Sequence, residues 1–215
     1  MAVKNEVRRI QLRDRIMEAA LHLFDHKGYH GVTIDEIVRE AETSKGGFYY
    51  HFSSKEALLF VIHDVFITYA LDKATLAEER YADPVKKLSA IIRGFLNVFH
   101  LYKPHITVFY QESNYLRKED REIIHQKRKA FKQIMKGVLD EGKQQHKFRP
   151  EINTDITVMA ILGMVNWLYK WYQQDGVCTI EQIGDYYVDL ILHSVLTTET
   201  LADHVSTAVE NKTMG

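Results

Sequence analysis

Nine consecutive residues, 44–52, combine the side chains that can recognise a nucleic acid: Ser-Lys-Gly-Gly-Phe-Tyr-Tyr-His-Phe. A lysine can reach a phosphate or a guanine edge, and tyrosine and histidine can donate to phosphate or contact a thymine methyl group. Two adjacent glycines leave the backbone uncovered for a close approach, although each costs a helix about 1 kcal/mol relative to alanine. The stretch predicts a short helix whose first turn contacts DNA.

Two local signals position this helix. Thr33-Ile-Asp-Glu36 is a capping box, which opens a short helix ending near Ala41. Ser44 can cap the second helix, which runs to about His51. Phe48 and Phe52 are four residues apart and predict the buried face, so Gly46 and its neighbours share the exposed face. Two short helices joined by a tight turn predict a helix-turn-helix, whose second helix enters the major groove.

The segment before this pair is predicted to complete a three-helix core. Apolar residues recur at intervals of three and four from Leu12, and the pattern stops at Lys27-Gly28, which indicates a helix end with a left-handed glycine. Residues 1–15 carry a net charge of +3. A basic arm beside a helix-turn-helix can follow the DNA backbone or the minor groove. Its basic residues are Lys4, Arg8, Arg9, Arg13 and Arg15.

Residues 33–59 resemble the amino-terminal domain of TetR/AcrR-family transcriptional regulators. The resemblance implies a homodimer that reads an inverted repeat in double-stranded DNA. One departure is Glu42, where the family usually has glycine; a left-handed backbone there would cost Glu42 about 1 kcal/mol. The resemblance implies that the DNA surface is lined by Thr33, Thr43, Ser44, Lys45, Gly46, Gly47, Tyr49, Tyr50, His51 and Lys55.

The whole chain predicts an all-α protein of about nine helices. It has 215 residues, 46% hydrophobic and 27% charged, with three prolines and no alternating strand pattern of useful length. We expect a DNA-binding domain over 1–55 and a ligand-binding and dimerisation domain over 56–215. The further helices are expected after a capping box at 53–56, from Pro84 to about 99, over 105–116, 118–145 and 155–173, and after a capping box at 179–182.

Cellular location follows from what the sequence lacks. No secretory signal pattern opens the chain, Cys178 is the single cysteine, and the most apolar run, 158–169, is shorter than the roughly 20 residues of a membrane span. A cytoplasmic protein with no membrane contact is therefore expected. No phosphate-binding glycine loop or metal-binding spacing is present, so no cofactor is expected.

A small hydrophobic effector is the predicted signal. Residues 117–136 carry a net charge of +5, which is either a solvated helix face or an anion site. The carboxy half resembles TetR-type repressors of fatty-acid or sterol degradation that respond to acyl-coenzyme A (acyl-CoA), which implies an apolar cavity with cations for the phosphates. The candidate ligand-binding residues are Phe66, Tyr69, Phe95, Phe99, Phe109, Tyr110, Arg117, Arg128, Phe131, Lys132, Met135 and Trp167.

Dimerisation is predicted on the last two helices. The helix over 155–173 is apolar nearly all round, so it is either a central core helix or is covered by a second subunit. In the resembled family the last two helices form the dimer's four-helix bundle, and Gly163 and Gly184 would permit close approach. The candidate interface residues are Met164, Leu168, Trp171, Tyr187, Leu190 and Ile191.

Other functions are weaker interpretations of the same sequence. A TetR-type sensor of multidrug or other hydrophobic ligands fits the same pattern. An enzyme is less favoured, because His22 and His26 lack the glutamate of a His-Glu-x-x-His zinc motif and no catalytic triad can be assigned around Cys178. A helical ligand-binding protein that no longer reads DNA is the third alternative, and Glu42 is the residue that favours it.

Overall fold

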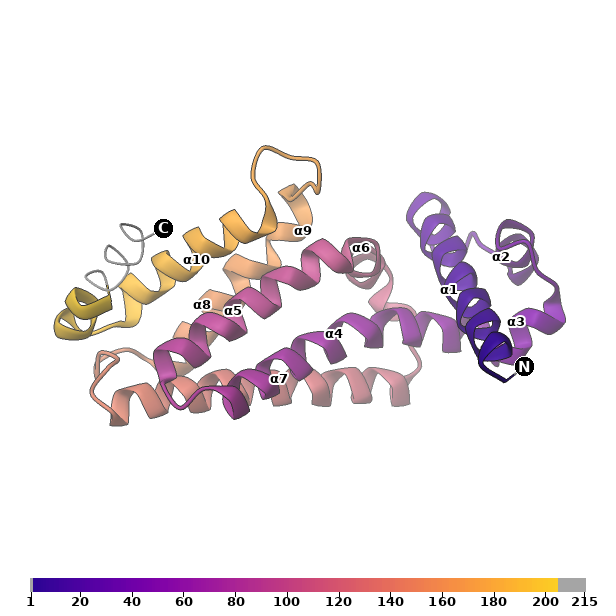
Figure 1. The fold of residues 1–215 in the computed structure, drawn as a ribbon. Helices are drawn as coiled ribbons and strands as arrows, with labels where there is room; N and C mark the ends of the chain where they lie inside the picture. The colour runs from indigo at the N-terminus through magenta and orange to yellow at the C-terminus, as the bar shows by residue number, and fades with distance from the viewer. Residues whose placement is uncertain (1, 205–215) are drawn as a thin grey trace. The chain divides into compact units, whose positions relative to one another are not determined.

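The computed structural model describes residues 2–204, and side chains from residue 9 onward. Over this part of the chain it contains ten α-helices, one 3₁₀ helix (η1) and one isolated antiparallel bridge, between Phe148 and Leu196 (Figure 1). The predicted all-α class is confirmed. The elements are α1 (Ala2–Lys27), α2 (Ile34–Glu40), α3 (Lys45–His51), α4 (Lys55–Arg80), α5 (Pro84–Leu101), α6 (Lys103–Glu112), η1 (Ser113–Tyr115), α7 (Lys118–Gln144), α8 (Thr154–Asn166), α9 (Leu168–Trp171) and α10 (Ile180–Val195).

Helices α1, α2 and α3 form a small three-helix core in the first of two compact units. This unit comprises Met1–Thr68 and Tyr102–Gln126. Phe24, Ile37 and Phe48 are fully buried where the three helices meet. Helix α1 ends as predicted at Gly28, whose φ of +70° is the left-handed conformation that glycine adopts without strain.

Helix α6 belongs to the same unit as the amino-terminal helices and packs against α1. Its buried Glu112 accepts a hydrogen bond from the backbone N–H of Tyr29 at 3.2 Å. The ring of Tyr115, in η1, stacks on the ring of Tyr29 with centroids 5.6 Å apart and also meets His30 edge-on. The loop between α1 and α2 is thereby fixed by residues more than 80 positions later in the chain.

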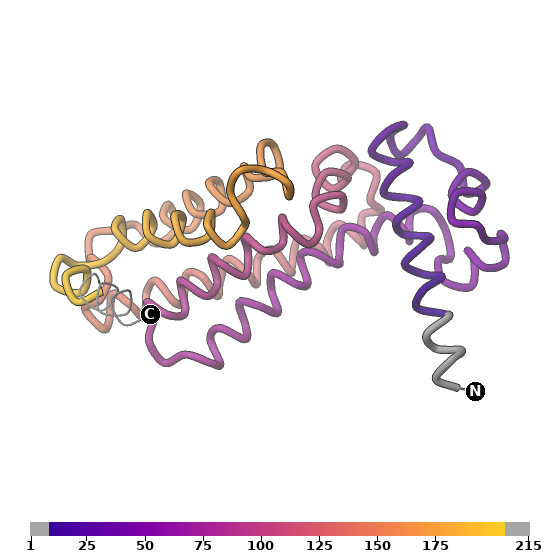
Figure 2. The backbone as a smooth tube through the Cα atoms, turned by 45° about the horizontal axis from the view of Figure 1, so that its top comes forward, coloured from indigo at the N-terminus to yellow at the C-terminus, as the bar shows by residue number. Residues whose placement is uncertain are grey.

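The second unit comprises Tyr69–Leu101 and Lys127–Gly215, described as far as residue 204. Helices α5 and α10 run side by side in it (Figures 1 and 2) and bury Ile92, Leu96, Val188 and Leu192 among others. At the end of α5, His100 shares a 2.8 Å hydrogen bond with the hydroxyl of the buried Tyr172.

The boundaries differ from the sequence prediction at three places. Helix α1 begins ten residues before Leu12. Helix α4 is capped by Ser54, whose hydroxyl accepts from the N–H of Ala57, so the expected box starting at Ser53 is displaced by one residue. The helix expected over 155–173 is broken at Trp167 into α8 and α9. The boxes at Thr33 and at Thr179 are confirmed.

Candidate nucleic-acid interface and ligand site

Helix α3 presents a polar and aromatic face to solvent. The hydroxyl of Ser44 accepts from the N–H of Gly47 at 3.1 Å and caps the first turn. Phe48 is fully buried on the opposite face, whereas Tyr49 and Tyr50 are 52% and 70% exposed. The Ser44 cap and the buried Phe48 hold α3 in place, and the exposed first turn of the helix is accessible to a phosphate or a base edge.

Lys45, the first residue of α3, is held by an acidic neighbour. Its ammonium lies 2.8 Å from the carboxylate of Asp35 on α2, and this hydrogen bond raises the pKa of Lys45. Both side chains are exposed, so the ion pair is weak and exchangeable. For Lys45 to contact DNA, either a phosphate would displace Asp35 from the Lys45 ammonium, or the Lys45 side chain would leave Asp35 and turn toward a base edge.

The two glycines of α3 have different structural roles. A Cβ on Gly47, a half-buried position, would lie 2.4 Å from the hydroxyl oxygen of Thr43. A Cβ on Gly46 would meet only the Ser44 hydroxyl, at 3.7 Å. A side chain at Gly47 would therefore require the Thr43 hydroxyl to move, whereas the exposed Gly46 has open space around it.

The turn between α2 and α3 has the left-handed residue that the family pattern implies. Glu42 has φ = +50°. Its N–H bonds to the carbonyl of Arg39 at 3.2 Å, and the N–H of Thr43 bonds to the carbonyl of Val38 at 2.9 Å. This is a Schellman motif, in which glycine usually occupies the position of Glu42. The turn thus keeps its geometry with a non-glycine residue under strain.

Two of the predicted DNA contacts are directed inward. The Lys55 ammonium donates to the carbonyls of Tyr29 and Val32, at 2.8 and 2.7 Å, and lies 4.2 Å from the centre of the Tyr29 ring. It therefore braces the loop before α2 and does not point to solvent as the sequence prediction assumed. His51 is half-buried, and burial together with Arg9 and Arg13 lowers its pKa.

Three of the predicted DNA-contact residues line a shallow hollow. Thr33, Tyr49 and Lys55 line a depression of about 320 Å³ next to the exposed face of α3. Of the basic arm, the exposed Arg9 and Arg15 and the half-buried Arg13 are described. Lys4 and Arg8 lie in α1, but their side chains are outside the described residues. The exposed cations and the open face of α3 define a helix-turn-helix protein that binds duplex DNA.

Comparison with known proteins identifies the family. Residues 16–62 match the family described as "Bacterial regulatory proteins, tetR family", and residues 81–195 match "Tetracyclin repressor-like, C-terminal domain". The chain belongs to the TetR family of DNA-binding transcriptional regulators. Its relatives include proteins described as HTH-type transcriptional repressors and regulators.

Three similar proteins extend over most of the chain. The repressor KstR2 of Mycobacterium tuberculosis is 22% identical over 185 residues, which is 85% of this chain and 92% of KstR2. The solved structure of PfmR from Thermus thermophilus is 28% identical, covers 83% of this chain and 97% of its own, and gives a TM-score of 0.77. AibR, solved with isovaleryl coenzyme A and operator DNA, has the same identity and coverage and a TM-score of 0.70.

The predicted ligand-binding residues fall into buried and exposed groups. Phe66 and Phe109 meet edge-on in the first unit with ring centroids 5.1 Å apart, and Phe95 and Phe131 meet in the second unit at 5.0 Å. The exposed residues of the set are Tyr110, Trp167, Arg117 and Arg128, and Tyr69 and Lys132 are half-buried. The buried residues are Phe66, Phe95, Phe99, Phe109, Phe131 and Met135.

Arg117 does not supply a free cation. Its guanidinium makes two hydrogen bonds, at 2.7 and 3.2 Å, to the buried carboxylate of Asp120. This pairing anchors the start of α7, so the sequence prediction of a phosphate ligand at this position is not supported by the geometry.

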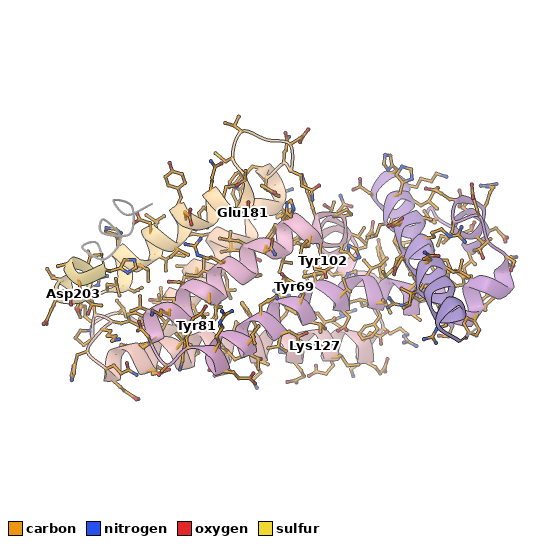
Figure 3. All side chains as sticks on the ribbon, viewed as in Figure 1. Tyr69, Tyr81, Tyr102, Lys127, Glu181 and Asp203 are labelled. Atoms are coloured by element: carbon orange, nitrogen blue, oxygen red, sulfur yellow. The ribbon has the colours of Figure 1, made fainter. Side chains whose placement is uncertain are left out.

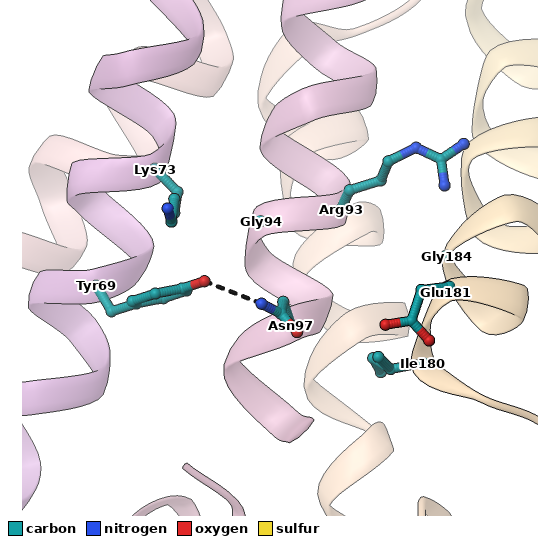
Figure 4. Close-up of a pocket in the computed structure, with 8 residues that line it drawn as sticks. All are labelled: Tyr69, Lys73, Arg93, Gly94, Asn97, Ile180, Glu181 and Gly184. Carbon is teal, nitrogen blue, oxygen red and sulfur yellow. Dashed lines mark hydrogen bonds between the residues drawn. The ribbon is translucent and has the colours of Figure 1, made fainter. Parts of the chain in front are cut away.

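A groove in the second unit is lined by polar and charged residues, of which the sequence prediction included only Tyr69. The groove is about 340 Å³ in volume and lies across α5 between α4 and the start of α10 (Figures 3 and 4). Tyr69 accepts a 3.0 Å hydrogen bond from the Asn97 amide. Lys73 has no carboxylate partner among the described residues, and its ammonium lies 5.2 Å from the centre of the Tyr69 ring. The lining residues are Tyr69, Lys73, Arg93, Gly94, Asn97, Ile180, Glu181 and Gly184.

The groove combines two cations with two carboxylates that lie in or beside it. Arg93 is paired with Asp185 at 2.5 Å on the α10 side, and both groups are exposed, so the pair is exchangeable. Glu181 lies at the first turn of α10, where its own N–H and the Thr179 hydroxyl lower its pKa. A phosphate or carboxylate would therefore find Lys73 and Arg93 on either side of α5, with one carboxylate at the end of the groove.

Several large apolar side chains of α8, α9 and α10 and of the Trp167 junction are exposed. Trp171 and Leu190, both predicted at the dimer interface, are 45% and 57% exposed, and Met164 and Tyr187 are half-buried. Leu168 and Ile191 are buried in the core of their own unit, so they offer no surface to a partner. Gly184 likewise faces Arg93 and Leu96 of α5. The exposed apolar side chains, here called the α8–α10 face, are Ile156, Met159, Trp167, Trp171, Tyr186 and Leu190.

Trp167, which the sequence prediction assigned to the ligand cavity, is 60% exposed. It lies at the junction of α8 and α9. Over the described residues no helix is both long and apolar enough to cross a membrane.

Proposed function

We propose that this regulator binds an inverted-repeat operator as a homodimer and is released from it by an acyl-CoA. The observation that supports the effector is the similarity to AibR, whose structure holds isovaleryl coenzyme A and operator DNA and is matched over 97% of its length. The α8–α10 face supports the dimer, since its six large apolar side chains are each exposed in this chain and burying them would favour an interface.

The groove around Lys73 supports an anionic effector. Coenzyme A carries phosphates, and phosphate recognition uses lysine and arginine donors. Lys73 and Arg93 supply both types, and Gly94 and Gly184 keep the groove free of further side chains. An effector without negative charge, as in the multidrug-sensor alternative, would make no use of these cations.

Release requires different affinities of the effector for the DNA-bound and DNA-free conformations. A ligand that binds both conformations equally shifts no equilibrium. An acyl-CoA must therefore favour a conformation in which the two α3 helices of a dimer no longer match the spacing of the half-sites, about 34 Å or one helical turn in helix-turn-helix dimers.

The test has two stages. Selection of binding sites from random duplex DNA should enrich a palindrome, and fluorescence anisotropy should then follow release of that duplex by isovaleryl-CoA and by palmitoyl-CoA. Coenzyme A without an acyl group is the matched control. No palindromic enrichment would refute the DNA-binding part of the proposal. Release by coenzyme A alone, or by neither thioester, would refute the acyl-CoA part.

A further inference from the structure

The exposed side of α1 carries two histidines one helical turn apart. His22 and His26 are separated by four positions, so they share one face of the helix, and their ring centroids are 4.4 Å apart. Both side chains are exposed, and no described residue makes a hydrogen bond to Nε2 of either ring. The pair therefore presents two neighbouring imidazole nitrogens to solvent.

The other nitrogen of each ring is held by an acceptor. Nδ1 of His22 lies 2.6 Å from a carboxylate oxygen of Glu40 on α2, and Nδ1 of His26 lies 2.8 Å from the backbone carbonyl oxygen of His22. Because carboxylates and carbonyls accept hydrogen bonds, Nδ1 carries the proton in both rings. In the neutral rings each Nε2 is then left with a free lone pair. Metal-binding histidines are oriented in the same way, with the second nitrogen donating to a carboxylate or a carbonyl.

The separation of the two rings indicates which ions fit. With a metal–nitrogen distance of about 2.1 Å and a ring radius of about 1.2 Å, an ion shared by both Nε2 atoms would lie about 3.3 Å from each ring centroid. The observed centroid separation of 4.4 Å then corresponds to a nitrogen–metal–nitrogen angle of about 85°. This is close to the right angle between adjacent ligands of an octahedral or square-planar ion, and imidazole nitrogens in these geometries suit Ni²⁺ and Cu²⁺.

The charge around the pair favours a cation. His22 lines a depression of about 320 Å³ whose other charged residues are Glu18, Glu40 and Glu42 and one cation, Arg15. Among the described residues no three histidine, cysteine, aspartate or glutamate side chains are placed to hold a metal together. The carboxylates therefore attract the ion without binding it directly, and water would fill its remaining coordination positions.

We propose that His22 and His26 bind a divalent transition-metal ion, Ni²⁺ or Cu²⁺, through their two Nε2 atoms. The pair lacks the glutamate of a His-Glu-x-x-His zinc-enzyme motif, but an ion that is only bound needs no general base. Glu40 is a positioning residue, because its carboxylate orients the His22 ring and makes it a stronger ligand. The same hydrogen bond connects the metal site on α1 to α2 of the helix-turn-helix.

The direct test is isothermal titration calorimetry of the full chain with NiCl₂ at neutral pH. His26→Gln should weaken Ni²⁺ binding about tenfold or more, because the second nitrogen is lost. Glu40→Gln should weaken it about 10- to 100-fold with both ligands still present. His193→Gln is the matched control and should bind as the wild type does. His193 is exposed and its Nδ1 lies 2.9 Å from the carbonyl oxygen of Asp189, as in His26, but it has no second histidine one turn away.

Electron paramagnetic resonance of bound Cu²⁺ gives a second measurement that identifies the ligands. At one equivalent of Cu²⁺, the hyperfine pattern should show two imidazole nitrogens in the wild type and in His193→Gln, and one in His26→Gln. Both histidines of the pair are exposed, so circular dichroism should show unchanged helix content in every variant. Equal Ni²⁺ affinities of the wild type and His26→Gln would overturn the site. A Cu²⁺ spectrum that changes in His193→Gln and not in His26→Gln would also overturn it, by placing the ion elsewhere.

Discussion

Replacing Glu42 by glycine should stabilise the protein and tighten DNA binding, for two separable reasons. A side chain at φ = +50° costs about 1–2 kcal/mol, whereas glycine adopts this conformation freely but loses about 0.5–1 kcal/mol through its larger unfolded-state entropy. The net gain is about 0.5–1 kcal/mol. For a chain of 215 residues this corresponds to a rise of roughly 2 °C in the melting temperature.

Glu42→Ala separates strain from charge. Alanine keeps the β-carbon and hence the backbone strain, so the melting temperature of the Glu42→Ala variant should stay close to that of the wild type. Both variants remove one negative charge beside α3. At about 8 Å from a phosphate in water that charge costs about 0.5 kcal/mol, so each variant should bind its operator about twofold more tightly at low salt. The gain should shrink as salt screens it.

The assays are differential scanning calorimetry and fluorescence anisotropy at two salt concentrations. If Glu42→Ala were stabilised as much as Glu42→Gly, strain in the Schellman turn would not be the cause. If Glu42→Gly were destabilised, the left-handed turn would not be the resting geometry of this loop. Unchanged affinity in both variants would show that the carboxylate lies away from the DNA.

Single contacts lead to four further predictions. Lys45→Ala should weaken operator binding about ten- to a hundredfold if Lys45 meets a base, and should flatten the salt dependence if it meets a phosphate, as measured by anisotropy. Because burial on α4 lowers the pKa of His63 to about 4, its contribution to stability is complete above pH 6.5 and is lost as pH falls toward 4. The free energy of unfolding should drop by about 2 kcal/mol for His63 alone between pH 7.5 and 5, and urea titrations should show a smaller drop in His63→Phe. Tyr186→Lys with Leu190→Lys should convert a dimer to monomers in light scattering without loss of helical circular dichroism, because both side chains are exposed. Lys73→Ala should weaken calorimetric binding of coenzyme A, and an unchanged affinity would place the phosphates elsewhere.

Features set by neighbouring residues were predictable from the sequence. The capping box at Thr33, the left-handed Gly28 and the proline at the start of α5 depend on hydrogen bonds or φ angles within one turn of chain. The helix-turn-helix could be predicted from two helix-capping signals and one apolar helix face. The strained backbone at Glu42 was anticipated because the family pattern places a left-handed residue there.

Features set by distant contacts were not predictable. Lys55 is close to the predicted DNA surface in sequence, but its ammonium donates hydrogen bonds to the carbonyls of residues 29 and 32. Ser53 and Ser54 are equally good caps, and packing of α4 decides between them. His63 follows the apolar period of its helix and gives no sign that its buried Nε2 has no hydrogen-bond partner among the described residues. The break between α8 and α9 at Trp167 is marked by no glycine or proline.

The contact between Glu112 and the Tyr29 amide limits how the protein can be dissected. A truncated gene ending near residue 55 or 68 would yield a fragment without the carboxylate that secures the loop ahead of α2, and with Tyr29 stripped of its stacking partner Tyr115. Chimeric regulators made by a single crossover would suffer in the same way. A domain exchange that keeps the DNA-binding unit intact must therefore transfer two separate segments, residues 1–68 and residues 102–126.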